Sequence, residues 1–271
     1  MALYFYPQTV LLPAPVLAPP RPPALKPIND VPLTRGLLKH VLTDFSERLY
    51  HSFRRQVRLV IHGGAVMVLH SSFNHRESTQ DVDYIHRAFA AEYHALGFVD
   101  AEQRLRTCIA ETALRFNLGA DWMNDHADVA LPMALDQHGR TYDPIFHASA
   151  RHENSVPQTI FSERGLALVA VPWPWAIALK LVRYAKQDPA DCAAILRLGF
   201  AQRGIRWTLA GLEQWISERC WPMGYSGYQP PQRAQLRQRI QDAITRAFPD
   251  NSLSSHRPPA RMTSETSLYF S

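Results

Sequence analysis

The stretch VRLVIHGG at residues 57–64, followed after a polar interval by DVD at residues 81–83, decides the fold of this chain. The first stretch is rich in apolar and β-branched residues, which predicts a buried strand. Its end at Gly63 and Gly64 predicts a tight turn into a helix, because glycine allows backbone N–H groups to approach phosphate oxygens closely. A strand of this kind is therefore typical of a phosphate-binding site.

The second stretch places two acids on a strand. Side chains alternate between the faces of a strand, so Asp81 and Asp83 point the same way while Val82 points into the core. Two carboxylates on one face, beside a phosphate-binding turn, predict a Mg²⁺ site.

Periodicity predicts the elements around these stretches and an α/β portion followed by a helical C-terminal half. The small mixed sheet flanked by helices that we also expect is what the family resemblance described below implies. Strands are expected at residues 58–62, 79–85, 159–162 and 167–171. Helices are expected at residues 34–53, 65–73, 92–98, 100–117, 175–187, 189–200, 208–220 and 231–248.

Composition predicts four regions along the chain. Residues 1–32 are rich in proline and are expected to form an extended arm. Residues 33–172 form the α/β domain, and residues 173–248 form the helical region. Residues 249–271 are rich in serine, proline and threonine and are expected to be a disordered tail.

Bulk properties limit the classes of function. The chain has 271 residues, of which 46% are hydrophobic, as in ordinary globular proteins that bury a core. Its net charge of +5 is compatible with a polyanionic partner, so RNA binding is a weaker alternative. Three well-separated cysteines predict a reducing compartment. Neither a membrane span nor a signal peptide is expected, which favours a cytoplasmic location and leaves a nuclear one open.

Two segments together resemble a known family. The segment IHGGA at residues 61–65 with RESTQDVD at residues 76–83 resembles the first motif of the nucleotidyltransferase superfamily, in its minimal and AbiEii-toxin-like branches. The segment WAIALKLVRYA at residues 175–185 with DPAD at residues 188–191 resembles the helical half of those branches. The resemblance covers roughly residues 34–200.

The resemblance implies transfer of a nucleotidyl group from ATP or another NTP to an acceptor, which could be a protein, a tRNA or a small molecule. Gly63 and Gly64 would hold the triphosphate, and Asp81 and Asp83 would bind Mg²⁺ and act in catalysis. Lys180 would lie near the phosphates as a point charge.

Three further residues of the first motif are implied in nucleotide binding. Ser78 or Thr79 would add a hydroxyl contact, and Arg76 would offer a guanidinium to an anion.

One feature departs from the family pattern. Active members of the superfamily carry a third carboxylate on a following strand, but the expected strand at residues 166–171 contains no acid. Asp128, after a predicted turn, and Glu163, in a hairpin loop, are the alternatives. The alternative function is therefore a catalytically inactive nucleotidyltransferase-fold module that binds a nucleotide or a protein partner.

Simpler interpretations exist for several of these residues. The glycine pair could be only a tight turn, and the two acids could face water. Asp188 is interpreted as a helix N-cap ahead of Pro189, whereas the role of Asp191 stays open. Lys180 and Arg183 share a helix face that either meets phosphates or faces solvent.

Overall fold

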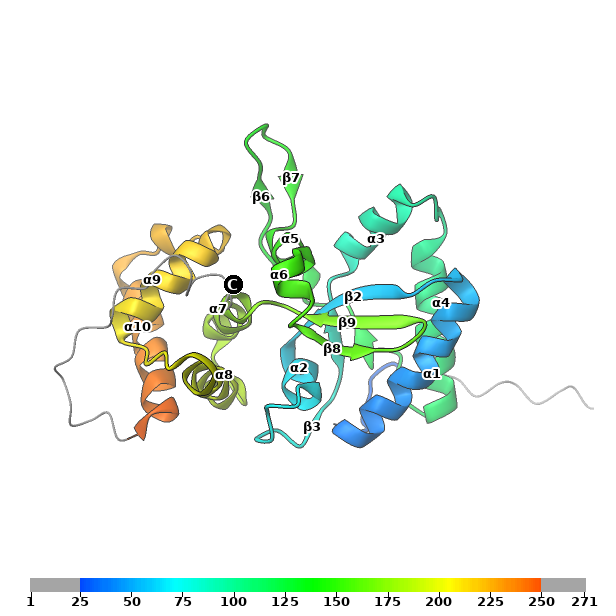
Figure 1. The fold of residues 1–271 in the computed structure, drawn as a ribbon, viewed down its shortest axis with the longest axis horizontal. Helices are drawn as coiled ribbons and strands as arrows, with labels where there is room; N and C mark the ends of the chain where they lie inside the picture. Colours follow the sequence, from blue (N-terminus) through cyan, green and yellow to red (C-terminus); the bar gives the residue numbers. More distant parts are fainter. Residues whose placement is uncertain (1–24, 250–271) are drawn as a thin grey trace, which may run out of the picture.

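The computed structural model describes residues 25–249. The expectations for the first 24 residues of the proline-rich arm and for residues 250–271 of the tail lie outside the described residues. Figure 1 shows an α/β half and a helical half side by side, with one hairpin projecting between them.

A five-stranded mixed sheet forms the centre of the α/β half, in the order β5-β4-β2-β9-β8. β2 runs parallel to β9 and antiparallel to β4, and β4 runs parallel to β5. The predicted α/β fold class, with helices in the C-terminal half, is therefore confirmed. The strands are β2 (Val57–His62), β4 (Val82–Tyr84), β5 (Met123–Asn124), β8 (Thr159–Ser162) and β9 (Leu166–Ala170).

The strand expected at residues 79–85 is divided into two. Its first part, β3 (Ser78–Thr79), pairs instead with β1 (Leu33–Thr34), and β4 begins only at Val82. The Asn29 side chain donates a hydrogen bond to the Gln80 carbonyl oxygen at 2.6 Å, which holds the chain where it passes from one sheet to the other. Asp81 therefore lies just before β4 and Asp83 lies within it.

Helices flank the sheet, and their ends have local causes. The Thr34 hydroxyl accepts a hydrogen bond from the Leu37 N–H at the start of α1. α2 starts at Gly63 and ends at Leu69, earlier than expected at both ends. At its C-terminal end, the Arg35 guanidinium donates hydrogen bonds to the carbonyl oxygens of Val68 and His70. The helices are α1 (Arg35–Phe53), α2 (Gly63–Leu69), α3 (His86–Ala95) and α4 (Ala101–Phe116).

The helix expected at residues 92–98 is wrong by six residues at its start, because α3 begins at His86. The cause is distant in sequence. The Asp128 carboxylate accepts hydrogen bonds from the backbone N–H groups of His86 and Arg87 at 2.9 and 3.0 Å. A helix start that is satisfied by a remote side chain leaves no local signal.

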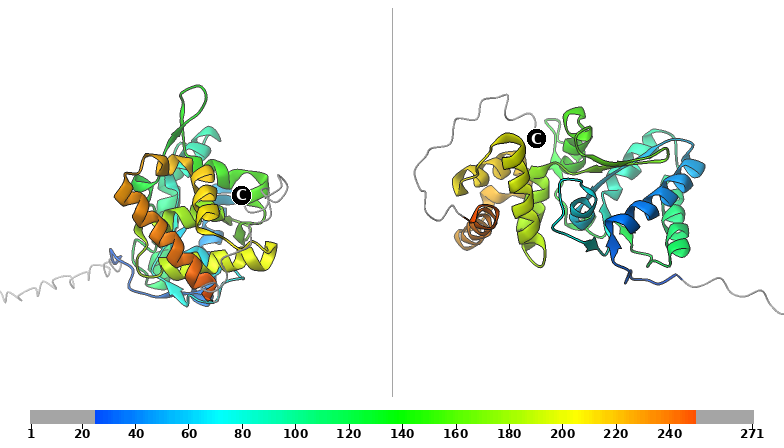
Figure 2. Two further views of the ribbon diagram at one scale, coloured as in Figure 1. Left: turned by 90° about the vertical axis from the view of Figure 1, so that its left-hand side faces the viewer. Right: turned by 60° about the horizontal axis from the view of Figure 1, so that its bottom comes forward.

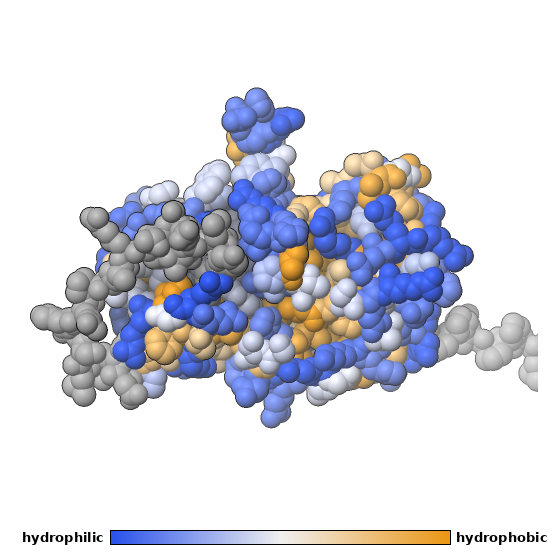
Figure 3. Space-filling model, in the orientation of Figure 1, coloured by the Kyte–Doolittle hydropathy of each residue, from blue (hydrophilic) through white to orange (hydrophobic). Residues whose placement is uncertain are grey.

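The segment between β5 and β8 carries elements that periodicity did not predict. A hairpin projects from the body of the molecule (Figure 1), and its tip is hydrophilic (Figure 3). Asp143 then caps a helix by accepting hydrogen bonds from the backbone N–H groups of Ile145 and Phe146. These elements are η1 (Asp128–Ala130), β6 (Ala134–Leu135), β7 (Thr141–Tyr142), α5 (Pro144–Ala150) and α6 (His152–Ser155).

The C-terminal half is helical, as predicted, and the described chain has no strand after β9. α7 packs against α8, α9 and α10 (Figure 2). The elements are α7 (Trp173–Arg183), α8 (Asp188–Arg203), α9 (Leu209–Arg219), η2 (Trp221–Met223), η3 (Tyr225–Gly227) and α10 (Pro230–Ala247).

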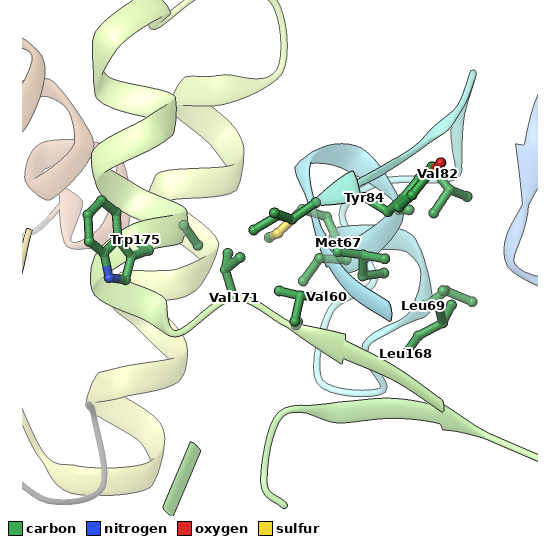
Figure 4. Packing of buried hydrophobic residues seen from close by; sticks show 14 of the residues in the cluster. Val60, Met67, Leu69, Val82, Tyr84, Leu168, Val171 and Trp175 are labelled. Atoms are coloured by element: carbon green, nitrogen blue, oxygen red, sulfur yellow. The ribbon is translucent and has the colours of Figure 1, made fainter. Parts of the chain in front are cut away.

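One hydrophobic core runs through both halves. Val60 and Leu168 of the sheet belong to the same buried cluster as Val171 and Trp175, which lie at the start of the helical half (Figure 4). The change in character near residue 172 is therefore a change of secondary structure within a continuous core. Among residues 25–249, no helix combines the length and apolarity that crossing a membrane requires.

Candidate active site

The two acids of the first motif lie together at the start of β4. Asp83 is in register with His62 on β2 and with Asn124 on β5. Burial raises the pKa of Asp83, and burial together with the negative charge of Asp83 raises the pKa of Asp81. Two desolvated, mutually repelling carboxylates favour the binding of a cation.

The glycine pair packs directly against the residues of its own motif. Gly63 has a φ of 72°, and a Cβ atom there would collide with the Asp83 carboxylate. A Cβ atom on Gly64 would collide with the Thr79 hydroxyl and the Arg76 guanidinium. The glycines therefore let the two halves of the motif close on each other.

Arg76 and its neighbours join the acid pair to the helical half. The Arg76 Nε atom donates to the Ser78 carbonyl oxygen at 3.1 Å, and its Nη1 atom donates to Asp191 on α8 at 3.1 Å. Thr79 is buried beside Gly64, and Ser78 precedes it in β3. The structure thus brings the predicted residues of the first motif together.

Asp191 is the centre of a cationic network that sequence reasoning left open. Its fully buried carboxylate contacts Lys180 Nζ at 2.7 Å, His75 Nε2 at 2.8 Å and Arg76 Nη1 at 3.1 Å. Burial raises the pKa of Asp191, but the hydrogen bond with His75 and the charge of Lys180 lower it by more than burial raises it. The net pKa of Asp191 therefore lies below its ordinary value. Lys180 is therefore held by a carboxylate that stays ionised.

The interpretation of Asp188 as a helix N-cap is wrong. α8 begins with Asp188 itself, and Gln187 occupies the capping position. The Asp188 carboxylate instead accepts hydrogen bonds from Arg183 Nε at 2.9 Å, Arg183 Nη2 at 3.1 Å and the Ala185 N–H at 3.0 Å. The buried Asp188 carboxylate therefore binds mainly the guanidinium of Arg183 and does not cap α8.

The strand at residues 166–171, which carries no acid, does not lie next to the acid pair. This strand is largely β9, which lies beside β2 on the side away from β4. Glu163 accepts a hydrogen bond from the Thr43 hydroxyl at 2.7 Å. Asp128 caps α3 through Oδ2, whereas its Oδ1 atom is buried without a hydrogen-bond partner among the described residues.

The strand next to the acid pair contributes an amide. The Nδ2 atom of Asn124 lies 3.5 Å from an oxygen of Asp81, and its Oδ1 atom accepts a hydrogen bond from the His126 N–H at 3.0 Å. Within residues 25–249, no group of three histidine, cysteine or acidic side chains is placed to hold a metal. Sequence reasoning missed Asn124 because β5 is only two residues long and looked like part of a turn.

The acid pair nevertheless fits Mg²⁺. This ion is commonly bound by one or two carboxylates, with substrate phosphates and water completing the coordination. Asp81 and Asp83 are both partly exposed, and burial keeps their pKa values raised despite the neighbouring cations, so further compensation of their negative charge is favourable. A divalent cation would supply that compensation.

His62 lies beside the acid pair with an unusual environment. Its ring is buried, its Nε2 atom has no hydrogen-bond partner among the described residues, and burial lowers its pKa to about 4. The imidazole is therefore neutral at pH 7 and adds no positive charge to the site.

Two well-formed cavities of the described structure lie away from the acid pair. One, of about 200 Å³, is lined by residues of α5, α7 and η2, including Trp175 and Trp221. The other, of about 190 Å³, is lined by residues of α7 and α10, including Arg239.

A scan against protein-family models, a search of curated proteins and a search of solved structures found no match to this chain. The interpretation of the site therefore rests on its residues and their geometry.

Proposed function

We propose that the protein is a Mg²⁺-dependent nucleotidyltransferase that uses ATP or another NTP. The observation that carries the proposal is the presence of two partly buried carboxylates beside cations that are held by Asp191. Asp81 and Asp83 have pKa values raised by burial, while Lys180 and Arg76 both bind the ionised Asp191. This combination suits a metal-bound polyphosphate, and it agrees with the resemblance to the AbiEii-toxin-like branch.

The chain's own residues bind and orient the nucleotide. Asp81 and Asp83 would hold the Mg²⁺ ion, which would supply charge neutralisation on the phosphates. Lys180 and Arg76 offset further negative charge. Gly63 keeps the backbone close to Asp83, and Gly64 keeps it close to the Thr79 hydroxyl and the Arg76 guanidinium.

The proposed reaction is a displacement of pyrophosphate from the α-phosphorus by the acceptor. An acceptor oxygen forms a bond to the α-phosphorus, and the bond from that phosphorus to the bridging oxygen breaks. Pyrophosphate leaves with the electron pair, and the proton of the acceptor passes to water. The acceptor is a hydroxyl or phosphate group of a protein, a tRNA or a small molecule.

The test is consumption of ATP with Mg²⁺ and candidate acceptors. We expect Asp81→Asn with Asp83→Asn to lower turnover by more than about 100-fold, because even residues that only support metal ligands contribute up to that factor. The matched control is Asp136→Asn with Glu153→Gln, which removes two carboxylates from the hairpin and from α6. Equal turnover in wild type and in the Asp81 and Asp83 variant would refute the proposal.

A second candidate is a nucleotide-binding module without catalysis. The observation that favours it is Asn124, an amide on the strand beside the acid pair. Calorimetry with ATP and Mg²⁺ separates the two candidates. Binding without turnover supports the module, whereas turnover that depends on the acid pair excludes it.

A further inference from the structure

We propose that Arg183 binds the terminal phosphates of the nucleotide, and that Asp188 is the positioning residue that aims the Arg183 guanidinium. This inference rests on the proposed function and adds to it the residue that would recognise the leaving pyrophosphate.

The first support is the geometry of the pair. Arg183 donates through Nε and Nη2 to the two oxygens of Asp188, so the plane of the guanidinium is fixed by two parallel hydrogen bonds. The side chain of Asp188 is only 3% exposed, whereas that of Arg183 is 73% exposed. A buried carboxylate thus anchors a guanidinium at the surface.

The second support is the number of N–H donors of the Arg183 guanidinium that remain after it has bound Asp188. A guanidinium has five N–H donors, and the contacts with Asp188 engage two nitrogens on one edge. The remaining donors belong to an exposed side chain and are available to an anion. An arginine fork of this kind suits phosphate oxygens better than a lysine does.

The third support is the position of Arg183 relative to the other charges. Arg183 stands three residues after Lys180 on α7, which is about 4.5 Å further along the helix axis. Lys180 Nζ lies 3.9 Å from Asp188 Oδ1, so the Arg183–Asp188 pair lies next to the Lys180–Asp191 pair. Lys180 is buried against Asp191, so Arg183 is the exposed cation of the pair.

The charge balance of this group also favours an anion. Three lysine and arginine cations contact two buried carboxylates, which leaves a net charge of +1; the adjacent acid pair carries −2, which a bound Mg²⁺ ion would offset. The members are Lys180, Arg183, Arg76, Asp188 and Asp191. A phosphate chain that starts at the metal-binding acids and passes Lys180 would reach Arg183 at its outer end. There the guanidinium would bind the terminal phosphates of the nucleotide and the pyrophosphate that is formed from them.

The test compares ligands that differ in their terminal phosphates. With Mg²⁺ present, we expect Arg183→Gln to weaken the binding of ATP and of inorganic pyrophosphate by about tenfold or more, as for the loss of charge-assisted hydrogen bonds. Binding of AMP, which lacks the terminal phosphates, should be unchanged. In turnover assays KM for ATP should rise more than kcat falls. Calorimetry and steady-state kinetics provide these readouts.

Three further variants control the test. Arg106→Gln removes an exposed arginine of α4 that also pairs with a carboxylate, and it should bind ATP like wild type. Arg183→Lys keeps the charge without the fork and should lie between wild type and Arg183→Gln. Asp188→Asn should resemble Arg183→Gln in KM, and its melting temperature shows whether it folds. The two Arg183 variants decide the question if it does not.

The outcomes separate this inference from the proposed function. If the wild-type protein turns over ATP and Arg183→Gln binds ATP and pyrophosphate as tightly as wild type, the inference is overturned while the proposed function stands. Equal weakening of AMP and ATP, or a fall in kcat at constant KM, also overturns it. A wild-type protein that neither binds nor consumes ATP overturns the proposed function itself.

Discussion

Gly63 shows how strongly a single residue can be constrained at this site. Its φ of 72° lies in the left-handed region, and a Cβ atom would collide with the Asp83 carboxylate. The first constraint acts on the backbone, and the second acts on a side chain that we propose to bind the metal ion. A substitution at this position therefore affects both folding and chemistry.

We expect Gly63→Ala to lower the free energy of unfolding by about 1–2 kcal/mol through its backbone conformation alone, with a further loss from the collision. Displacement of Asp83 should also reduce ATP turnover. Gly139→Ala is the matched control, because Gly139 has a φ of 73° and nothing within 4 Å of its Cβ position. Urea denaturation of both variants measures the difference. Equal losses of stability with full turnover would show that the approach of Asp83 does not constrain Gly63.

The same scale shows what residue patterns could reveal. The spacing of Asp81 and Asp83 marked two carboxylates that the structure does bring together. Asn124 and Asp191 were not assigned, because each acquires its role from a partner more than forty residues away in the chain. Only folding brings such partners together.

The hairpin of β6 and β7 depends on one side chain of another element. Arg87 of α3 donates to Asp143 Oδ2 at 2.7 Å and to the Asp128 carbonyl oxygen at 2.8 Å, on either side of the hairpin. Asp143 is almost completely buried, and it also caps α5. The base of the hairpin is therefore held by Arg87 from outside the hairpin.

We expect Arg87→Ala to increase the rate of proteolytic cleavage within residues 131–142 by about tenfold or more, because charge-assisted hydrogen bonds at the base of the hairpin are lost. Limited proteolysis followed by mass spectrometry measures this rate. Arg140→Ala, near the tip, is the control, since Arg140 is 76% exposed and its ion pair within residues 25–249 is with Asp136, four residues away. Unchanged cleavage in Arg87→Ala would mean that packing alone holds the hairpin.

At the scale of the whole molecule, Asp191 joins the two halves. It lies on α8, but two of its partners, His75 and Arg76, come from the α/β half, and Lys180 comes from α7. Its pKa is lower than its ordinary value of 3.8. A carboxyl group with a lowered pKa in the folded state stabilises the protein above pH 3.8, and this contribution is lost as the pH falls through the lowered value.

We therefore expect Asp191→Asn to lower the free energy of unfolding by about 3–5 kcal/mol at pH 7, because buried cations lose their partner. The difference from wild type should shrink as the pH falls below about 4. Thermal unfolding across this pH range measures both effects. Asp136→Asn, in an exposed ion pair, serves as the control and should melt close to wild type. A constant difference at all pH values would contradict an ionised Asp191.

The sequence by itself determined the fold class, the main strands and the helical C-terminal half, because these depend on hydrophobic periodicity and on glycine and proline signals close together in the chain. It also pointed to Gly63, Gly64, Asp81 and Asp83. The tertiary structure alone decided that β5, not β9, lies beside β4, that Asp188 binds Arg183, and that Asp191 joins Lys180 to Arg76. Strand order and buried ion pairs depend on which distant segments meet in the core, and local sequence patterns do not determine which segments meet.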